Sequence, residues 1–278
     1  MAPSVSVVVT TRNEGRNLRH LLDSLAGQVE GPFDLADVIL VDAKSTDNTA
    51  AVARSYADRL PMQVVVEPCG RGRGRNLGAA LAKGDLLAFI DADCIANAYW
   101  LRSLVTSWNG EPDRVVAGRT QLTGYWAFTK LHRVELPHRG VDTTWPSCNL
   151  AYSRALFERL GGFDDVFVTA EDIDLNYRAV EAGATIAHAP QAIVYAKARG
   201  SITGFLKQAY WNGFGRKQLT VKHGGLWHEY SFKDMIALNG SSFWGAARMA
   251  AGLAGYLAAK AGRTPPHLQK QNRPKVNT

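Results

Sequence analysis

The most constraining feature of this sequence is an alternation of short apolar runs with segments of helical periodicity. Four runs are typical of buried strands: residues 5–11, 38–41, 63–66 and 86–90. Four segments that follow them have the periodicity of helices: residues 18–25, 46–57, 76–82 and 99–108. This order of strands and helices predicts an α/β fold with a Rossmann-like, doubly wound and mostly parallel sheet.

Polar stretches follow three of the predicted strands at their carboxyl ends. They are Thr11-Arg-Asn-Glu14, Asp42-Ala-Lys-Ser45 and Asp91-Ala-Asp93. Ligands of doubly wound sheets bind beyond the carboxyl ends of the strands, so we expect one crevice to collect all three stretches. The carboxylates of Asp91 and Asp93 would repel each other at this spacing, which predicts that a positive charge lies beside them.

The pattern loosens after Gly118, although two further elements are predicted. A short strand over residues 149–152 is followed by a helix. Glu171 and Asp172 then fall in the first turn of another helix, where the helix dipole favours acidic side chains. A cap of that helix is therefore one explanation of this acidic pair.

The charge of the chain is divided unevenly. Residues 1–196 hold 19 Lys and Arg against 23 Asp and Glu, a balance of −4, whereas residues 197–278 hold 13 against 2, a balance of +11. We therefore expect a globular domain over residues 1–196 and a basic appendage over residues 197–278. Such an appendage suits an anionic partner, with lipid headgroups and nucleic acid as the candidates.

The appendage has two segments that suggest contact with a membrane. One is a helical stripe of apolar residues: Ile202, Phe205, Leu206, Ala209, Tyr210, Gly213 and Phe214. The other, residues 235–259, has Arg248 as its single charge, but Arg248 and the break Asn239-Gly-Ser-Ser242 weaken a simple spanning helix. A span, an interfacial or re-entrant hairpin and a helix packed on the body all stay open. We expect an anionic membrane surface as a partner.

Cysteine usage and the N-terminus bear on the compartment. Cys69, Cys94 and Cys148 form neither a disulfide framework nor a zinc motif, which fits a reducing compartment. The N-terminus has no basic n-region and no long apolar h-region, so we expect no signal peptide. With the basic appendage, this favours the cytoplasmic face of a membrane.

The ordered motifs of the chain resemble those of a known enzyme family. Asp42-Ala-Lys-Ser45, Gly72-Arg-Gly-Arg-Asn-Leu-Gly78, Asp91-Ala-Asp93 and Glu171-Asp172 stand in the order and spacing of family 2 glycosyltransferases, which have the GT-A fold. The resemblance covers about residues 4–195 and extends to membrane-associated members like dolichyl-phosphate mannose synthase and cellulose synthase. It implies a GT-A catalytic domain that transfers a single sugar, with inversion, from a nucleotide-sugar to a lipid-linked or glycan acceptor. GDP-mannose is the preferred donor, with GDP- and UDP-sugars both open.

The resemblance also implies roles for individual residues. Mg²⁺ or Mn²⁺ is expected on Asp93, with Asp91 on the metal or the ribose, since hard cations prefer oxygen ligands and neutralise a leaving diphosphate. Asp172 is expected to act as the general base, with Glu171 orienting it. The nucleotide pocket is expected to contain Thr11, Arg12, Asn13, Glu14, Asp42, Arg75, Asn76 and Asp91. Asn149 and Trp211 are expected in the sugar or acceptor pocket.

Departures from the family pattern leave some of these roles open. Asp42-Ala-Lys-Ser45 replaces the common Asp-Asp-Gly-Ser, so the nucleobase is not determined, and a local Asx-turn is the other explanation of Asp42. Val194-Tyr-Ala-Lys197 lacks the histidine that many relatives carry there, so a third protein ligand to the metal is not assured.

Two other functions are compatible with parts of the sequence. A sugar-phosphate nucleotidyltransferase normally has a glycine-rich first loop, which Thr10-Thr-Arg-Asn-Glu14 is not. A non-catalytic RNA-binding module would use the basic appendage and the Arg71-Gly-Arg-Gly-Arg75 run as a flexible loop. The appendage has no nucleic-acid motif and its aromatic residues follow a helical stripe, so we expect no nucleic-acid partner.

Overall fold

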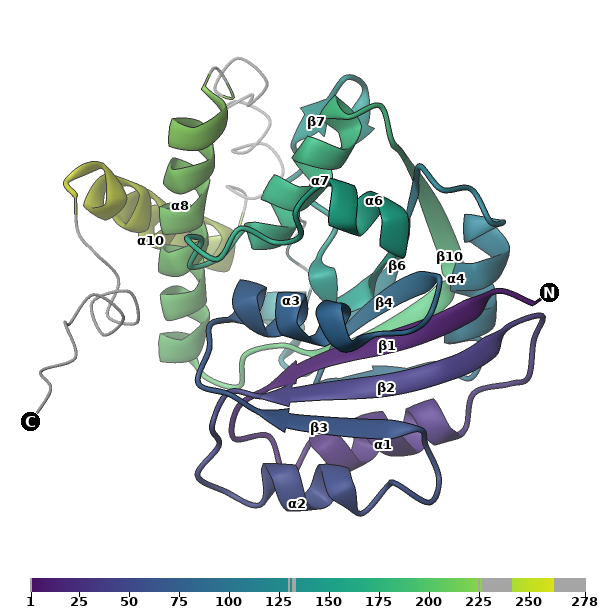
Figure 1. The fold of residues 1–278 in the computed structure, drawn as a ribbon. Helices are drawn as coiled ribbons and strands as arrows, with labels where there is room; N and C mark the ends of the chain where they lie inside the picture. The colour runs from purple at the N-terminus through teal and green to yellow at the C-terminus, as the bar shows by residue number, and fades with distance from the viewer. Residues whose placement is uncertain (1, 130, 132–133, 225, 227–241, 263–278) are drawn as a thin grey trace, which may run out of the picture. The chain divides into compact units, whose positions relative to one another are not determined.

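The structure, a computed structural model, describes residues 2–129, 131, 134–224, 226 and 242–262 (Figure 1). The chain divides into two compact units. The first comprises Met1–Gly124, Glu135–Asp164 and Asp172–Ala198. The second comprises Tyr125–Val134, Asp165–Glu171 and Arg199–Thr278. Each unit is described separately below.

The first unit is built on an eight-stranded mixed sheet. Its strand order is β3 (Met62–Val66), β2 (Asp34–Asp42), β1 (Ser4–Thr11), β4 (Leu86–Asp91), β9 (Leu150–Ser153), β6 (Arg114–Thr123), β10 (Thr185–Lys197) and β5 (Cys94–Ala96). The first four strands are mutually parallel, which confirms the doubly wound half of the sheet. β9 runs antiparallel to both of its neighbours, and β5 runs antiparallel to β10, so the sheet is less uniformly parallel than the sequence pattern indicates.

Helices cover both faces of this sheet, as Figure 1 shows for α1 and α2 on one side and α3 on the other. One face packs on α1 (Leu18–Ala26), α2 (Thr49–Arg54) and α4 (Trp100–Trp108). The other face packs on α3 (Arg71–Leu81), α6 (Arg154–Arg159) and α7 (Glu171–Glu181). Strand β1 shows the reason: Val7 and Val9 lie in the first cluster and Val8 in the second, so both faces of the strand are buried and the run is continuously apolar.

Helix α3 begins at Arg71, five residues before the predicted start at Asn76. Glycine has a low helix propensity, so the Arg71-Gly-Arg-Gly-Arg75 run predicts a loop, but tertiary contacts override that preference. A Cβ on Gly74 would come within 3.0 Å of the Thr10 side chain, and one on Gly78 within 2.4 Å of Val8. The glycines therefore let α3 approach the sheet closely, and the run is not the flexible Arg-Gly loop that an RNA-binding module would use.

Other differences are local. The helix predicted over residues 46–57 is shorter, because α2 spans Thr49–Arg54. The strand predicted from residue 149 begins at Leu150, after a 3-10 turn, η1 (Ser147–Asn149). Strands β6 and β10 were not predicted, and the register of β10 against β6 shifts between Ala189 and Ile193, next to Pro190. A hairpin of β7 (Pro137–His138) and β8 (Val141–Asp142) completes the unit.

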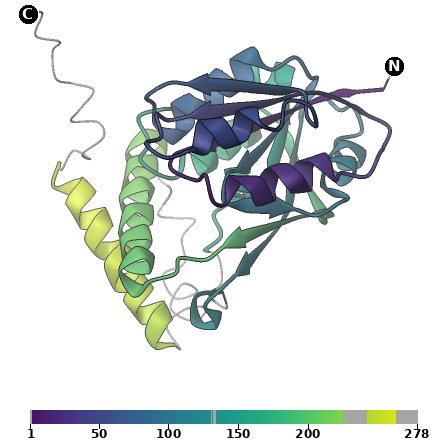
Figure 2. The same ribbon diagram turned by 90° about the horizontal axis from the view of Figure 1, so that it is seen from below.

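The second unit contains α5 (Trp126–Thr129), α8 (Ile202–His223) and α10 (Phe243–Lys260), of which α8 and α10 lie side by side in Figure 2. Glycines permit this contact: a Cβ on Gly213 would lie 1.8 Å from the Gly252 carbonyl oxygen, and one on Gly255 would lie 1.8 Å from that of Tyr210. The close backbone approach therefore depends on Gly213 and Gly255.

The apolar stripe predicted on α8 is buried at three of its seven positions, half-buried at three, and exposed at Ile202. Phe205, Ala209 and Phe214 are buried, and the Phe205 ring stacks on Phe128 at 4.1 Å between centroids. Residues 235–241 of the predicted apolar window lie outside the described residues, and residues 243–259 of the window belong to α10. Among the described helices, none combines the length and hydropathy that a membrane span requires.

Candidate functional site

Three of the predicted site residues meet at one edge of the sheet. In the parallel register Thr11 pairs with Asp42 across β1 and β2, and Thr10 pairs with Asp91 across β1 and β4. The carboxyl ends of β1, β2 and β4 therefore lie level with one another, which confirms that the three polar stretches share one edge.

Hydrogen bonds tie the loop after β1 to the loop after β2. The Asn13 N–H donates to Ser45 Oγ at 2.8 Å, and Asn13 Oδ1 accepts the Thr46 N–H at 2.8 Å. The Glu14 N–H donates to Thr49 Oγ1 at 2.9 Å. Asn13 has a left-handed backbone, with φ of 56°, a conformation that asparagine tolerates. Asn13 thus shapes the loop, whereas Arg12 is exposed beside it.

Asp42 is buried at the end of β2 and is held by its own turn. Its Oδ1 accepts the Ser45 N–H at 2.9 Å and the Ser45 hydroxyl at 2.5 Å, while Lys44 takes a left-handed φ of 57°. The local Asx-turn that was the other explanation of Asp42 is therefore present. It fixes the carboxylate in a single orientation, which is also what an acceptor for a nucleobase requires.

Thr11 carries an unsatisfied hydroxyl at the same edge. The side chain is buried, and within the described part of the chain Thr11 Oγ1 has no hydrogen-bond partner. A buried polar atom without a partner costs about 1–3 kcal/mol, so such atoms are uncommon unless water or a ligand bonds them. This hydroxyl therefore marks the edge as a place where a polar ligand would be stabilised.

A guanidinium lies beside the paired carboxylates. Arg75 Nη2 donates to Asp91 Oδ1 at 2.8 Å, and the two side chains are 3% and 37% exposed. The Arg75 guanidinium carbon also lies 5.4 Å from the centre of the Phe163 ring. The positive charge that the acidic pair predicts is thus supplied, at least in part, by the protein itself. Arg75 was expected to face the nucleotide, but in the structure it is buried and holds Asp91.

Asn76 supports the same arrangement. Its side-chain amide donates to the Phe163 carbonyl at 2.7 Å and accepts the Phe163 N–H at 2.8 Å. Both groups of the amide are engaged by one backbone residue, which fixes the Gly162-Phe163 turn whose ring lies by Arg75. These contacts are those of a residue that builds the wall of the site, so we leave Asn76 out of the proposed nucleotide contacts.

Cys94, the residue after Asp93, is buried in the apolar cluster on which Cys148 packs. The neighbouring Cys148 thiol, burial, and the charges of Asp91 and Asp93 raise the pKa of the Cys94 thiol. Cys94 therefore stays protonated, and it is no ligand for a hard cation. Cys148 follows Ser147, whose N–H donates to Asp172 Oδ2 at 3.0 Å. This apolar cluster thus connects the segment of Asp93 to the turn that holds Asp172.

Buried polar contacts anchor that turn to α7. Asn176 Nδ2 donates to the carbonyls of Thr143 and Trp145, both at 2.9 Å, and the Tyr152 hydroxyl donates to Asn176 Oδ1. Burial raises the pKa of Tyr152 well above its usual value, which keeps it a donor. Asn176 and Tyr152 were not predicted as site residues. The only signal for Asn176 was a polar residue within a predicted helix. From the sequence, such a residue cannot be distinguished from one on the solvent-exposed face.

Three of the remaining predicted residues are not among those at the carboxyl ends of β1, β2 and β4. Asn149 is fully buried, with Oδ1 accepting from Trp100 Nε1 at 2.8 Å and Nδ2 donating to the Ala192 carbonyl at 3.0 Å. Its contacts are structural, and we do not place it in a sugar pocket. Glu171 is buried at the start of α7, directly after Ala170 with its left-handed φ of 71°. Trp211 belongs to the second unit, so its role stays a prediction.

The donor set suits a divalent cation only in part. Two carboxylates, Asp91 and Asp93, supply hard oxygen donors, but Asp91 already accepts from Arg75. Among the described residues, no three His, Cys, Asp or Glu side chains converge on one point. The set fits Mg²⁺ or Mn²⁺ if substrate phosphates and water complete the coordination, as is usual for Mg²⁺.

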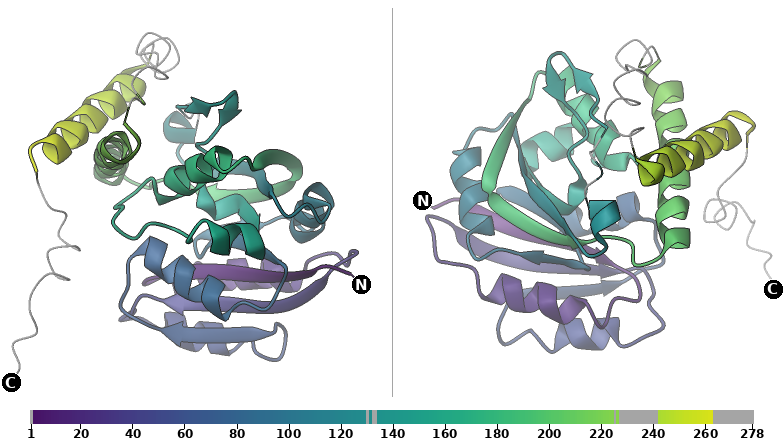
Figure 3. Two further views of the ribbon diagram at one scale, coloured as in Figure 1. Left: turned by 45° about the horizontal axis from the view of Figure 1, so that its top comes forward. Right: turned by 180° about the vertical axis from the view of Figure 1, so that it is seen from behind.

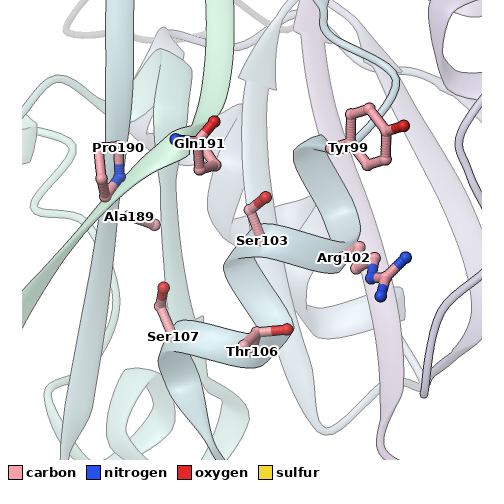
Figure 4. Close-up of a pocket in the computed structure, with 8 residues that line it drawn as sticks. All are labelled: Tyr99, Arg102, Ser103, Thr106, Ser107, Ala189, Pro190 and Gln191. Atoms are coloured by element: carbon pink, nitrogen blue, oxygen red, sulfur yellow. The ribbon is translucent and has the colours of Figure 1, made fainter.

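A separate cavity of about 410 Å³ lies between α4 and the irregular part of β10 (Figure 4). It is lined by Tyr99, Arg102, Ser103, Thr106, Ser107, Ala189, Pro190 and Gln191. None of the candidate site residues lines it, so it is not part of the candidate active site.

The mixed sheet, its helical layers and the polar edge are those of a GT-A fold. Residues 6–159 match the family model of glycosyl transferase family 2, and residues 115–259 match that of glycosyl transferase family group 2. The chain belongs to glycosyl transferase family 2.

Individual relatives agree with this assignment. The chain is 28% identical over 204 residues to the glycosyltransferase AglE of Haloferax volcanii, covering 69% of this chain and 66% of AglE. It is 27% identical over 249 residues to the glucosyl-dolichyl phosphate glucuronosyltransferase of the same organism, covering 78% and 77% of the two chains. The chain spans about half the length of other curated relatives that it matches, at 48% of each.

A solved structure shares the fold. The mannosyltransferase PcManGT from Pyrobaculum calidifontis, solved with GDP-Man and Mn²⁺, superposes with a TM-score of 0.64 over 98% of this chain and 79% of its own. The sequences are 20% identical, so the likeness concerns the fold.

Proposed function

We propose that this protein transfers a single sugar from a nucleotide-sugar to a lipid-linked or glycan acceptor, with inversion at the anomeric carbon and with Mg²⁺ or Mn²⁺. The observation that carries the proposal is the common edge of Thr11, Asp42 and Asp91. The apolar cluster of Cys94, on which Cys148 packs, connects this edge to the turn that holds Asp172. A donor site and a second carboxylate are the two parts that such a transfer needs.

The donor would bind at the strand edge. Asp42, fixed by Ser45, would accept from the base, and the buried Thr11 hydroxyl would gain the partner that it lacks among the described residues. Arg12 and Glu14 would line the same pocket. GDP-mannose is the donor that we propose first, and the GDP-Man bound to the structural relative PcManGT supports this choice only through the shared fold.

Asp91 and Asp93 would hold the divalent cation against the diphosphate. When bound, the metal neutralises the negative charge that develops on the leaving nucleoside diphosphate. Arg75 keeps the Asp91 carboxylate oriented when no nucleotide-sugar is bound, because its guanidinium offsets the repulsion between Asp91 and Asp93. Arg75 therefore acts through Asp91 as a positioning residue.

Asp172 would accept the proton of an acceptor hydroxyl. The acceptor oxygen forms a bond to the anomeric carbon, the bond from that carbon to the diphosphate breaks, and the proton passes to the Asp172 carboxylate. Ser147 fixes one carboxylate oxygen and the Ile173 N–H bonds the other at 2.9 Å. If the acceptor is a lipid phosphate, no proton needs removal, and Asp172 would orient the acceptor.

The acceptor and the site of action are also part of the proposal. A lipid-linked acceptor is supported by the relative whose name states a dolichyl phosphate substrate. Attachment to the cytoplasmic face of a membrane follows from the basic C-terminal region and would bring the enzyme to such an acceptor.

Isothermal titration of the purified protein with GDP-mannose and with UDP-sugars, each with and without Mn²⁺, tests the proposal. We expect at least one of these donors to bind more tightly when Mn²⁺ is present, and Asp93→Asn to abolish the difference. Metal-independent binding, or no binding of any nucleotide-sugar, would contradict the proposal. A matched control is Asp113→Asn, which changes an exposed carboxylate in an ion pair with Arg159.

A further inference from the structure

Helix α10 presents a continuous apolar face to solvent. Phe243, Leu253 and Leu257 are 77%, 58% and 52% exposed, which is unusual for large apolar side chains. The exposed positions of α10 are Phe243, Ala246, Ala250, Leu253, Ala254, Leu257 and Lys260. They recur at intervals of three and four residues, so they form one stripe along the helix, and Lys260 at its end is the stripe's single polar residue.

The opposite side of α10 is packed within the second unit. Gly255 lies against the backbone of Tyr210 on α8, and Gly245 and Gly255 are the buried positions of the helix. Arg248 is partly buried, and this burial lowers the pKa of its guanidinium. The internal charge of α10 therefore lies away from the apolar stripe. Figure 3 shows α10, in yellow, beside α8 in two further views.

The charges of the second unit specify the kind of partner. Neither α8 nor α10 contains an aspartate or a glutamate. Apart from Arg248 on the packed side of α10, the Lys and Arg residues of the two helices are Lys207, Arg216, Lys217, Lys222 and Lys260. A second copy of the same face would bring like charges together, whereas an anionic surface would complement them. An apolar stripe among basic residues is the pattern of a helix that lies in a lipid interface.

We propose that α10 lies in the plane of an anionic bilayer, with Phe243, Leu253 and Leu257 inserted below the headgroups. The inference rests on the membrane attachment in the proposed function and deepens it. It assigns the contact to α10, because Phe205 and Phe214 of the α8 stripe are buried whereas Phe243, Leu253 and Leu257 are exposed. Insertion at this shallow depth needs no spanning helix. It also favours acceptors whose sugar-bearing group stands at the same surface, which is where a lipid-linked substrate presents it.

Vesicle flotation tests this assignment. The full chain is mixed with vesicles of phosphatidylcholine alone or of phosphatidylcholine with phosphatidylglycerol. We expect flotation with the anionic vesicles, weakened by added salt because screening reduces the attraction of the basic residues. The double variant Leu253→Gln with Leu257→Gln should reduce the partition coefficient by about tenfold or more, because two inserted apolar groups are lost.

The matched control is Val221→Gln on α8. Val221 is 72% exposed, so the control makes the same kind of change at a position outside the stripe. We expect it to float like the parent. All three proteins should have the same circular dichroism and melting temperature, since the altered side chains face solvent.

Several outcomes would overturn the proposal. They are a parent that does not float with anionic vesicles, a double variant that floats as well as the parent, and equal flotation with neutral vesicles. A parent dimer that the double variant converts to monomers in sedimentation velocity would assign the stripe to a second copy instead. Nucleotide-sugar binding in the same preparations separates the two proposals, because a protein that binds the donor but does not float overturns the membrane contact and leaves the sugar transfer standing.

Discussion

Arg75 Nη2 lies 2.8 Å from Asp91 Oδ1, and this buried guanidinium offsets the electrostatic repulsion between Asp91 and Asp93. The pair places a positive charge at the carboxyl end of β4 whether or not a cation is bound. Asp91 is therefore oriented before a nucleotide arrives, which is the preorganisation that an electrostatic site needs.

Replacing Arg75 with methionine should expose this dependence. Arg75→Met keeps much of the buried volume but leaves two carboxylates without their guanidinium, so we expect the free energy of unfolding to fall by about 1–3 kcal/mol. Mn²⁺ should restore more stability to Arg75→Met than to the parent, because the cation replaces the lost charge. Urea denaturation with and without Mn²⁺ measures both effects.

The control for Arg75→Met is Arg73→Met. Arg73 pairs with Glu67 at 3.4 Å, but both side chains are about half exposed, at 49% and 42%. Exposed pairs contribute at most about 1 kcal/mol, so this variant should be near the parent. Equal stabilisation of all three proteins by Mn²⁺ would contradict the role given to Arg75.

Asp172→Asn should separate chemistry from donor binding. The amide oxygen can still accept from Ser147, but the side chain no longer accepts a proton, so we expect transfer to an acceptor hydroxyl to slow by about 100-fold or more. Donor binding measured by titration should stay within about twofold of the parent. An unchanged rate with a hydroxyl acceptor would show that Asp172 is not the base.

Tyr152→Phe tests whether the buried contacts of α7 position Asp172. The change removes the hydroxyl that donates to Asn176, so we expect a stability loss of about 1–2 kcal/mol. If the Thr143–Ser147 turn positions the base, kcat falls while the KM for the donor is unchanged. Tyr56→Phe is the control, since its hydroxyl bonds Asp23 away from the site. A loss of stability with unchanged kcat would show that Tyr152 stabilises the fold but does not position Asp172.

Gly213→Ala should disturb the second unit selectively. A Cβ there would meet the Gly252 carbonyl at 1.8 Å, so α8 and α10 must separate, at a cost of about 1–3 kcal/mol. Hydrogen exchange should accelerate in both helices and stay unchanged in β1 to β4. Gly200→Ala is the control, because no atom of the described residues lies within 4 Å of the place that its Cβ would take. Equal exchange in the two variants would refute this packing.

Ser4→Ala tests a pH-dependent contact at the amino end of β1. Hydrogen bonds from the Ser4 hydroxyl and backbone hold the pKa of Asp85 below its ordinary value of 3.8. A carboxyl whose pKa is lowered on folding contributes stability above its unfolded pKa and loses it as the pH falls through the folded pKa. The parent should therefore exceed Ser4→Ala in stability above about pH 5, with the difference shrinking below pH 3.8 in urea titrations. A pH-independent difference would contradict this linkage.

Much of the parallel half of the sheet could be predicted from local pattern. Val7, Val8 and Val9 alternate between the two core clusters, and a strand buried on both faces must be apolar throughout. Leu18, Leu21, Leu22 and Leu25 are all buried on one face of α1, as their spacing predicts. The polar residues at the strand ends were equally visible, because parallel strands bring their carboxyl ends to one edge.

Other features depend on partners that are distant in sequence. The sequence suggests a solvent or phosphate contact for Arg75 until Asp91 and Phe163 are seen beside it, and a pocket position for Asn149 until Trp100 and Ala192 are placed. The direction of β9 could not be predicted, since periodicity carries no information on which neighbour a strand pairs with.

The sequence by itself determined which segments are strands and helices in the first half of the chain and which edge gathers the acidic residues, because burial periodicity and parallel connection act over short separations. Only the tertiary structure decided which side chains meet and which apolar faces stay uncovered. Phe205 of α8 is buried while Leu253 of α10 is exposed, although both belong to apolar stripes. The physical reason is that an apolar face lowers the free energy equally well against any partner, so its pattern specifies burial without specifying what buries it.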